Sequence, residues 1–329
     1  MRTPRVRPSQ NIMRVSATVP EASRLPLTII SGEPGAGKTT LLGQLVRQDH
    51  DEGLAVILDA LEPLNLDARV VARAAGSYAE LTNGTRCFAL AGELSAELAE
   101  LRMILAPATH VVLEAHGTES LRRVAGYGYM PGYRPDGIII VMEAEALYDG
   151  LQDDVRRHQL STVLHTADIL IINKLDALDR EHRAAPRRWL DDVFPSLRVL
   201  ETSHGQVAGS LLLGVSPAAA RRDARAVPGN WDPTTYRATT RTRAARGAEL
   251  AERCRLWRIE SEIPISAPRF RNWVSLLPQS VIRGTGDVLI EEDQGHRYRF
   301  HMIGHRWQLQ RGEPWGSAPP ETQLSIVGL

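Results

Sequence analysis

Short apolar, β-branched runs alternate with segments of helical spacing through the N-terminal part of the chain. The apolar runs cover residues 25–30, 55–59, 109–114, 137–142, 168–173 and 197–200. Helical spacing appears at residues 40–46, 95–105, 153–165 and 180–193. This alternation is typical of a mostly parallel sheet with helices on both faces. We therefore predict an α/β domain over residues 25–216.

The pattern changes after residue 216. Residues 217–250 carry an arginine-rich stretch, Arg237–Arg246, and we interpret them as an interdomain linker. Residues 251–329 predict a small α+β domain. Its expected elements are a strand over 254–265, a helix over 266–277 opened by Ser266 and Pro268, and short strands at 281–283, 287–291, 298–303, 307–310 and 324–327. Residues 1–24 lack an apolar segment, and we interpret them as a disordered tail.

A glycine-rich segment stands between the first predicted strand and the first predicted helix. Gly32-Glu33-Pro34-Gly35-Ala36-Gly37-Lys38-Thr39 fits the pattern G-x-x-x-x-G-K-S/T of phosphate-binding loops. Such a turn aims backbone N–H groups and a helix N-terminus at one point, which suits a phosphate anion. Lys38 would reach the β- and γ-phosphates, the Thr39 hydroxyl would ligate Mg²⁺, and Thr40 completes the nucleotide-binding set. The sequence therefore predicts a P-loop NTPase; the alternative is an ordinary glycine- and proline-rich turn.

Lysine is rare in this chain, and its two positions are informative. Only two of the 39 basic residues are lysine, Lys38 and Lys174. Lys174 lies in Asn173-Lys174-Leu175-Asp176, which resembles the guanine-reading motif of GTPases. A compact ammonium group on a flexible stem fits against a nucleotide where a planar guanidinium does not. We therefore predict that the nucleotide is GTP.

The Asn-Lys-Leu-Asp segment assigns roles to individual residues. The Asp176 carboxylate would accept hydrogen bonds from the guanine N1–H and 2-amino group, a pair that adenine lacks. Asn173 would hold the loop and contact the base edge, and Lys174 would pack along the nucleotide. Ser203-His204-Gly205, after the last predicted strand of the domain, would complete the base pocket through backbone amides. Both segments also fit plain polar turns.

An acidic residue ends the strand predicted at 109–114. Glu114-Ala115-His116-Gly117 matches the acid-x-x-Gly element that GTPases place at a strand end. Glu114 would hold Mg²⁺ through its water shell, and the Gly117 N–H would sense the γ-phosphate. Lys38, Glu114 and Gly117 form the predicted catalytic set. Taken alone, Glu114 also fits an ordinary strand-end carboxylate.

The order of these motifs resembles the CobW-like GTPase family over roughly residues 27–329. Arg283-Gly284-Thr285-Gly286 resembles that family's Arg-x-Lys-Gly, and Ser325-Ile326-Val327-Gly328 its closing strand. The resemblance implies GTP binding with slow, Mg²⁺-dependent hydrolysis. It also implies a role in delivering zinc or cobalt to a metalloprotein client.

Three segments depart from the family pattern. Gly84-Thr85-Arg86-Cys87-Phe88 keeps one of the three family thiols, Cys87, as a transition-metal ligand. Asp59-Ala60-Leu61-Glu62 replaces the family's Asn-Glu-Phe-Gly, and Thr285 replaces a lysine. Structural zinc sites take about four ligands, so we expect weak zinc binding that depends little on Cys87. His296, His301 and His305 are interpreted as surface imidazoles rather than as a metal site.

Composition restricts the partners and the compartment. The formal net charge is zero, which gives no general attraction to nucleic acid. No apolar run reaches 18 residues, so we expect no membrane span. The two cysteines lie far apart, consistent with a reducing cytoplasm. A non-hydrolysing GTP-dependent regulatory switch, a P-loop kinase and homo-oligomerisation stay open, although Asn173–Asp176 argues against the kinase.

Overall fold

The structure is a computed structural model that describes most of both predicted domains. The described residues are 24–48, 53–58, 64, 66, 69, 71–90, 94–96, 98–99, 108–115, 121–179, 182–215 and 253–329. Residues 1–23 of the predicted tail, the predicted linker, the Asp59–Glu62 segment, and His116 and Gly117 lie outside them.

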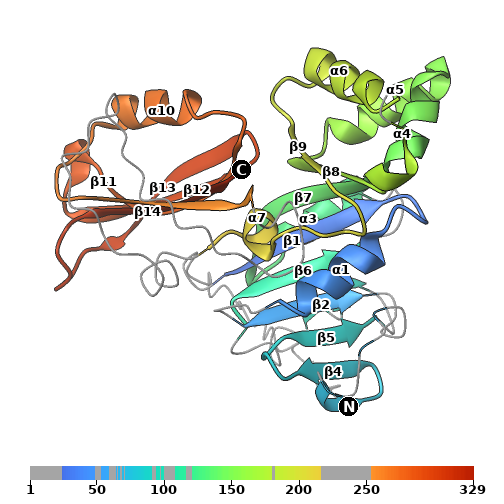
Figure 1. Cartoon of the computed structure of the whole chain (residues 1–329). Coiled ribbons are helices and arrows are strands. Elements are labelled where there is room, and N and C mark those ends of the chain that lie inside the picture. The colour runs from blue at the N-terminus through green and yellow to red at the C-terminus, as the bar shows by residue number, and fades with distance from the viewer. Residues whose placement is uncertain are drawn as a thin grey trace, which may run out of the picture.

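The N-terminal domain is built on one nine-stranded sheet (Figure 1). Its strands are β1 (Leu25–Gly32), β2 (Leu54–Leu58), β3 (Val71–Ala75), β4 (Tyr78–Leu81), β5 (Arg86–Ala89), β6 (His110–Glu114), β7 (Tyr133–Glu143), β8 (Ile169–Asn173) and β9 (Arg198–Glu201). The spatial order is β3-β4-β5-β2-β6-β1-β7-β8-β9. All pairs from β5 to β9 are parallel, and only the β3–β4 and β4–β5 pairs are antiparallel. The predicted mostly parallel sheet is confirmed.

The antiparallel edge of this sheet was not predicted. β4 and β5 form a hairpin whose turn contains Asn83 and Gly84, a hairpin signal present in the sequence. Asn83 Nδ2 donates to the carbonyls of Val46 and Gln48 at 2.9 and 2.8 Å. These bonds attach the hairpin to the end of the first helix.

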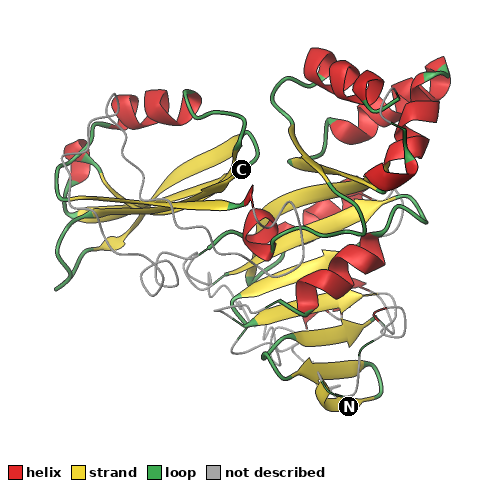
Figure 2. Cartoon of the chain, viewed as in Figure 1, coloured by secondary structure: helices red, strands yellow, loops and turns green. Residues whose placement is uncertain are grey.

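Helices cover both faces of the nine-stranded sheet, as Figures 1 and 2 show. Their bounds are α1 (Lys38–Val46), α3 (Leu121–Gly126), α4 (Ala144–Leu151), α5 (Asp154–Leu164), α6 (Ala184–Val193) and α7 (Gly209–Leu213). Buried residues of α1 and α7 pack in one apolar core, and those of α3, α4, α5 and α6 pack in a second core. Neighbouring residues of the strands alternate between these two cores, as the pleat requires. Short 3₁₀ helices occur at η3 (Tyr127–Tyr129), η4 (Leu175–Ala177) and η5 (Glu291–Asp293).

The C-terminal domain is an antiparallel sheet of five strands with one helix on it. Its elements are β10 (Arg255–Ser261), α10 (Ala267–Ser275), β11 (Val281–Leu289), β12 (His296–Ile303), β13 (Arg306–Pro314) and β14 (Thr322–Gly328), in the sheet order β10-β14-β11-β12-β13. Phe270 of α10 packs on Phe300 of β12 with ring centroids 5.1 Å apart. The predicted small α+β domain is confirmed.

Two local predictions for this domain need correction. The strands expected at 281–283 and 287–291 are one continuous strand, β11, which accommodates Gly284 and Gly286. A Cβ on Gly286 would lie 1.9 Å from the Gln323 carbonyl, so close strand pairing requires this glycine. Ser266 occupies the N-cap of α10 as predicted, but its side chain makes no capping bond. The Glu292 carboxylate instead accepts from the Ala267 N–H at 3.0 Å.

Polar contacts join the two domains. Arg306 of β13 pairs through two nitrogens with Asp168, which is buried immediately before β8. Arg198 Nε donates to the Val281 carbonyl at 2.9 Å. Asp168 and Arg198 stand at the N-terminal ends of β8 and β9, so the C-terminal domain contacts that edge of the large sheet. Among the described helices, none is long and apolar enough to cross a membrane.

Candidate nucleotide-binding site

The predicted motifs meet at the carboxyl-terminal edge of the large sheet. β1 ends at Gly32, β6 at Glu114 and β8 at Asn173. In the sheet, β6 and β7 are the parallel neighbours of β1, and β8 is the parallel neighbour of β7. Glu114 pairs in register with Ile30, two residues before Gly32. In parallel sheets, ligands bind outside this edge. The fold therefore brings residues that are far apart in sequence to one rim.

The phosphate-binding loop has a backbone that requires glycine at two positions. Gly32 has φ 152°, and a Cβ there would lie 2.0 Å from the Val141 carbonyl oxygen. Gly37 has φ 97° and caps α1, and its Cβ would lie 2.1 Å from Asn173 Nδ2. Between them, Glu33, Pro34 and Gly35 are exposed and Ala36 is buried. The loop thus presents its backbone to solvent at the start of α1.

Lys38 lies folded across this loop. Its Nζ donates to the carbonyls of Gly32 at 2.8 Å and Glu33 at 2.9 Å. Burial lowers the pKa of the Lys38 ammonium, while the nearby carboxylates of Glu114 and Glu33 act in the opposite direction. The first turn of α1 contains no acidic residue, so the helix itself places no negative charge at its positive end. An anion at the loop would meet both the ammonium and the helix N-terminus.

The residues predicted to hold magnesium lie next to Lys38. Thr39 is half-buried in the first turn of α1, and Thr40 is exposed beside it. Glu114 is buried and close enough to Lys38 for its charge to affect the lysine pKa. Hydroxyl and carboxylate oxygens are hard ligands of the kind that Mg²⁺ prefers. The donor set therefore fits the ion.

Asn173 joins the phosphate-binding loop to the segment after β9. Its Nδ2 donates to the Ala36 carbonyl at 3.0 Å, and its Oδ1 accepts from the Gly205 N–H at 3.0 Å. The side chain is 2% exposed. Both ends of the amide are thus engaged within the protein. The predicted loop-holding role matches this geometry, and contact of Asn173 with a base edge stays a prediction.

Gly205 is the second residue of this connection, and its backbone N–H, one of the amides predicted to complete the base pocket, donates to Asn173 Oδ1. It has φ 64°, and a Cβ would lie 2.9 Å from the backbone nitrogen of Leu41 in α1. The segment therefore approaches the helix so closely that only glycine fits.

Lys174 adopts a left-handed backbone conformation with φ 59°. Its Nζ lies 2.9 Å from Glu143 Oε2 at the end of β7. Glu143 was not predicted as a site residue, although it ends a strand on the same rim. The ion pair orients the Lys174 side chain along the rim.

Asp176 lies in η4 with its side chain 52% exposed. A hydrogen bond from the Ser203 side chain lowers the pKa of the Asp176 carboxyl, and His204 adds to this effect. His204 Nε2 lies 4.0 Å from Asp176 Oδ2. The carboxylate is therefore ionised and accessible, and Ser203 reaches the site through its side chain rather than only through its backbone.

Cys87 lies away from this rim, inside the apolar core. It is fully buried on β5 beside Val56, its register partner on β2. Burial raises the pKa of the Cys87 thiol to about 12. Metal ligation needs the thiolate, so this position argues against the predicted ligand role. Among the described residues, no group of three or more His, Cys, Asp or Glu side chains could hold a metal ion.

The three C-terminal histidines have different surroundings. His296 lies 3.0 Å from Asp293, and His305 is exposed in the turn between β12 and β13. His301, in contrast, points into the domain interface, with its Nε2 3.1 Å from Asp136 Oδ1 and its side chain 14% exposed. The surface prediction is therefore wrong for His301.

Two models of known protein families match this chain. Residues 26–201 match the model of the CobW/HypB/UreG nucleotide-binding domain, and residues 254–329 match that of the cobalamin synthesis protein CobW C-terminal domain. The chain belongs to the CobW/HypB/UreG family. The resemblance inferred from the motif order is thereby confirmed.

Individual relatives of this CobW-family chain are distant. It is 26% identical over 227 residues to "Zinc chaperone CobW" of Pseudomonas aeruginosa, covering 59% of this chain and 60% of that protein. It is 20% identical over 324 residues to "Zinc chaperone YjiA" of Escherichia coli, covering 93% and 94%. The solved structure of Zn(II)-bound YjiA aligns over 93% of this chain and 94% of its own, with a TM-score of 0.44 and 17% identity. The matches thus span about three fifths of the CobW relatives and nearly all of YjiA.

Proposed function

We propose that this chain binds GTP with Mg²⁺ and hydrolyses it slowly. The observation that carries the proposal is the Asn173 amide, which holds the phosphate-binding loop and the segment after β9 at the same place. The predicted phosphate site and the predicted guanine-reading turn would thereby be parts of one binding site. Membership of the CobW/HypB/UreG family supports the same activity.

The phosphates would bind at the N-terminus of α1. Lys38 would exchange its two carbonyl partners for phosphate oxygens, because a charged acceptor makes a stronger hydrogen bond than a carbonyl. Thr39 and Glu114 would hold Mg²⁺, which would neutralise charge on the β- and γ-phosphates. Gly117 stays a prediction for the γ-phosphate contact, since it lies outside the described residues.

Guanine selectivity would rest on Asp176. The carboxylate is ionised and open to solvent, so it can accept two hydrogen bonds from the guanine edge without a prior rearrangement of buried groups. A site built for two such donors disfavours a base that lacks them by up to about 10⁴–10⁵-fold. The Lys174–Glu143 ion pair would place the lysine stem beside the base.

The experiment that tests guanine reading compares GTP, ATP and xanthosine triphosphate. Asp176→Asn should weaken GTP binding and favour xanthosine triphosphate, because the new amide meets a carbonyl instead of an amine. Asp179→Asn is a matched control, since Asp179 is an exposed acid three residues away in the same segment. Equal affinity of the parent for ATP and GTP would refute the assignment.

We propose further that the nucleotide state controls delivery of a metal to a metalloprotein client. The support is the family and the relatives named as zinc chaperones. The burial of Cys87 favours a second candidate, a GTP-dependent switch whose nucleotide changes partner affinity without metal carried on this thiol. Phosphate release above background, measured with and without Zn²⁺ or Co²⁺, separates them: metal-dependent turnover supports delivery, and tight GTP binding without release supports the switch.

A further inference from the structure

A cavity lies between the domains, at the opposite edge of the large sheet from the phosphate-binding loop. Its volume is about 210 Å³. Pro26 near the start of β1, His110 at the start of β6 and Asp136 in the first part of β7 line it. A strand rises about 3.3 Å per residue, so β1 separates this cavity from Gly32 by roughly 20 Å. The cavity is therefore distinct from the nucleotide site.

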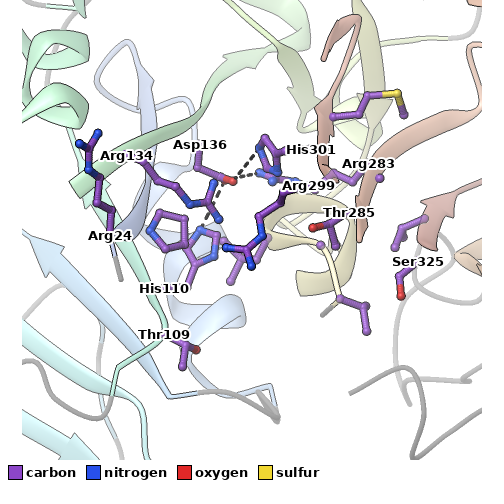
Figure 3. Close-up of a pocket in the computed structure, with 17 residues that line it drawn as sticks. Arg24, Thr109, His110, Arg134, Asp136, Arg283, Thr285, Arg299, His301 and Ser325 are labelled. Atoms are coloured by element: carbon purple, nitrogen blue, oxygen red, sulfur yellow. Dashed lines mark ion pairs between the residues drawn. The ribbon is translucent and has the colours of Figure 1, made fainter. Parts of the chain in front are cut away.

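The C-terminal sheet supplies the facing wall (Figure 3). His301 of β12 and Ser325 of β14 both pair in register with Thr285 of β11, so the three side chains form one row across the sheet. Arg283 stands two residues before Thr285 and so lies on the same face. The opposite face packs against α10 through Phe300 and Leu324. This face, which carries the polar row together with Ile303 and Val327, is thus turned toward the nucleotide-binding domain.

Basic side chains outnumber acidic ones in the cavity wall. Arg24, Arg134, Arg283 and Arg299 line it, against Asp136 as the one carboxylate among the lining residues. The cavity therefore carries excess positive charge even with both histidines neutral.

Asp136 is already committed to protein partners. Arg283 Nη2 lies 2.9 Å from its Oδ2, His301 Nε2 lies 3.1 Å from its Oδ1, and the Thr28 hydroxyl donates to it. Burial by itself would raise the pKa of the Asp136 carboxyl, but Arg283 and His110 bring it well below its ordinary value. One negative charge is thus fixed next to Arg283. Arg299 Nε lies 3.8 Å from Oδ1 of Asp287, a carboxylate that does not line the cavity.

Four buried side-chain atoms in this wall have no hydrogen-bond partner among the described residues: Nε and Nη2 of Arg283, Nε2 of His301 and Oγ of Ser325. Arg283 Nη2 and His301 Nε2 still form the ion pairs with Asp136, so Arg283 Nε and Ser325 Oγ, of residues 2% and 1% exposed, are the two with neither kind of contact. Buried polar groups in proteins are almost always hydrogen-bonded, and a bound water or ion is one explanation for an exception. Both atoms can donate, which suits an acceptor with several oxygens.

The geometry points to a binding site for a small oxyanion, a phosphate- or carboxylate-bearing molecule held between the two domains by Arg283, Arg299 and Ser325. Guanidinium groups recognise both anions through paired N–H donors. The volume is below the roughly 300–1,000 Å³ of pockets for drug-sized ligands, so the occupant is small. A metal ion does not fit, because arginine offers no lone pair and no metal-ligand group is found among the described residues.

The test uses calorimetric titration of the full chain in a chloride buffer, with inorganic phosphate in one arm and succinate in the other. Lys38→Ala serves as the common background, so that phosphate at the loop before α1 does not contribute. The result therefore does not depend on whether the chain binds GTP. Arg299→Gln should weaken binding about tenfold or more and Ser325→Ala about threefold or more, the losses expected for a charged and a neutral hydrogen bond. Both changes leave the Asp136–Arg283 pair in place.

Arg311→Gln is the matched control, because Arg311 is an arginine of the same sheet that pairs with Asp293 and does not line the cavity. Saturable binding of either probe that falls in both cavity variants and not in the control supports the site, and the arm that binds identifies the anion. The proposal is overturned if neither probe saturates by about 10 mM, a Kd too weak for a specific site. It is equally overturned if the cavity variants bind like the background, which would mean an adventitious ion only, or if Arg311→Gln weakens binding as much as they do.

Discussion

Removing the Asn173 amide should both destabilise the fold and weaken GTP binding. Asn173→Ala deletes two buried hydrogen bonds and leaves the Ala36 carbonyl and the Gly205 N–H without partners. A typical bond contributes about 0.5–1.5 kcal/mol net, and a stranded buried group costs about 1–3 kcal/mol. Because water can reach part of the exposed loop, we expect a loss of about 2–4 kcal/mol in the free energy of unfolding. GTP affinity should fall about tenfold or more, because a cost of about 1.4 kcal/mol for ordering the loop on binding raises the Kd tenfold.

A double-mutant cycle with Gly37 sharpens this prediction. A Cβ at position 37 would lie 2.1 Å from Asn173 Nδ2, and its backbone φ of 97° is unfavourable for any L side chain. Gly37→Ala alone should therefore incur the clash as well as about 1–2 kcal/mol of backbone strain. In the Asn173→Ala background the clash disappears and only the strain stays. The double variant should then be more stable than the sum of the single losses implies, by about 0.5–3 kcal/mol.

Equilibrium urea unfolding of the four proteins without nucleotide measures the cycle, and GTP titration measures the functional loss. Asn272→Ala is the control, because Asn272 is exposed on α10, and its stability change should stay within about 0.5 kcal/mol. A parent-like Asn173→Ala protein in both assays, or single losses that simply add, would show that Asn173 does not connect the two loops as described.

Four further outcomes are expected. Lys38→Ala should abolish measurable GTP binding with the circular dichroism spectrum retained, and parent-like affinity would contradict the loop assignment. Cys87→Ser should lower the free energy of unfolding by about 1–3 kcal/mol, because it buries a hydroxyl in an apolar core, while chelator competition should show unchanged zinc affinity. Burial lowers the pKa of His110 from its ordinary 6.5, with Asp136 opposing the shift, so the folded protein holds the neutral imidazole. Because the unfolded chain then binds more protons, the free energy of unfolding should fall as the pH drops below 6.5. His110→Gln should make the urea unfolding midpoint less dependent on pH in this range. Arg306→Ala should lower the free energy of unfolding in urea by about 1–3 kcal/mol, because its loss leaves the buried Asp168 carboxylate with fewer partners. The half-exposed position of Arg306 keeps this loss moderate.

The sequence alone determined the features that depend on local chemistry. The phosphate-binding loop was predictable because a glycine at φ 97° before Lys38 and the following helix are encoded within a few residues. The parallel sheet was predictable because strands buried on both faces read as continuous apolar runs, as Ile169–Asn173 does. The order of motifs and the two lysines indicated the family.

Only the tertiary structure decided which distant groups meet. Asn173 holds Ala36 and Gly205 because three loops converge on one rim, and no local pattern encodes that convergence. The environment of Cys87 also depended on strand pairing. Its strand, β5, pairs with β2, and this pairing buries the predicted metal ligand in the apolar core.

The interdomain cavity is another feature that local sequence patterns did not predict. Arg283 was visible in the sequence as part of a family-like motif, but its partner Asp136 lies 147 positions earlier and was not singled out. Short motifs record the conformation that a segment needs, whereas charge pairing across domains is fixed by how two separately formed surfaces dock. The phosphate-binding loop could therefore be predicted from the sequence, whereas the basic interdomain cavity could be identified only from the arrangement of both sheets.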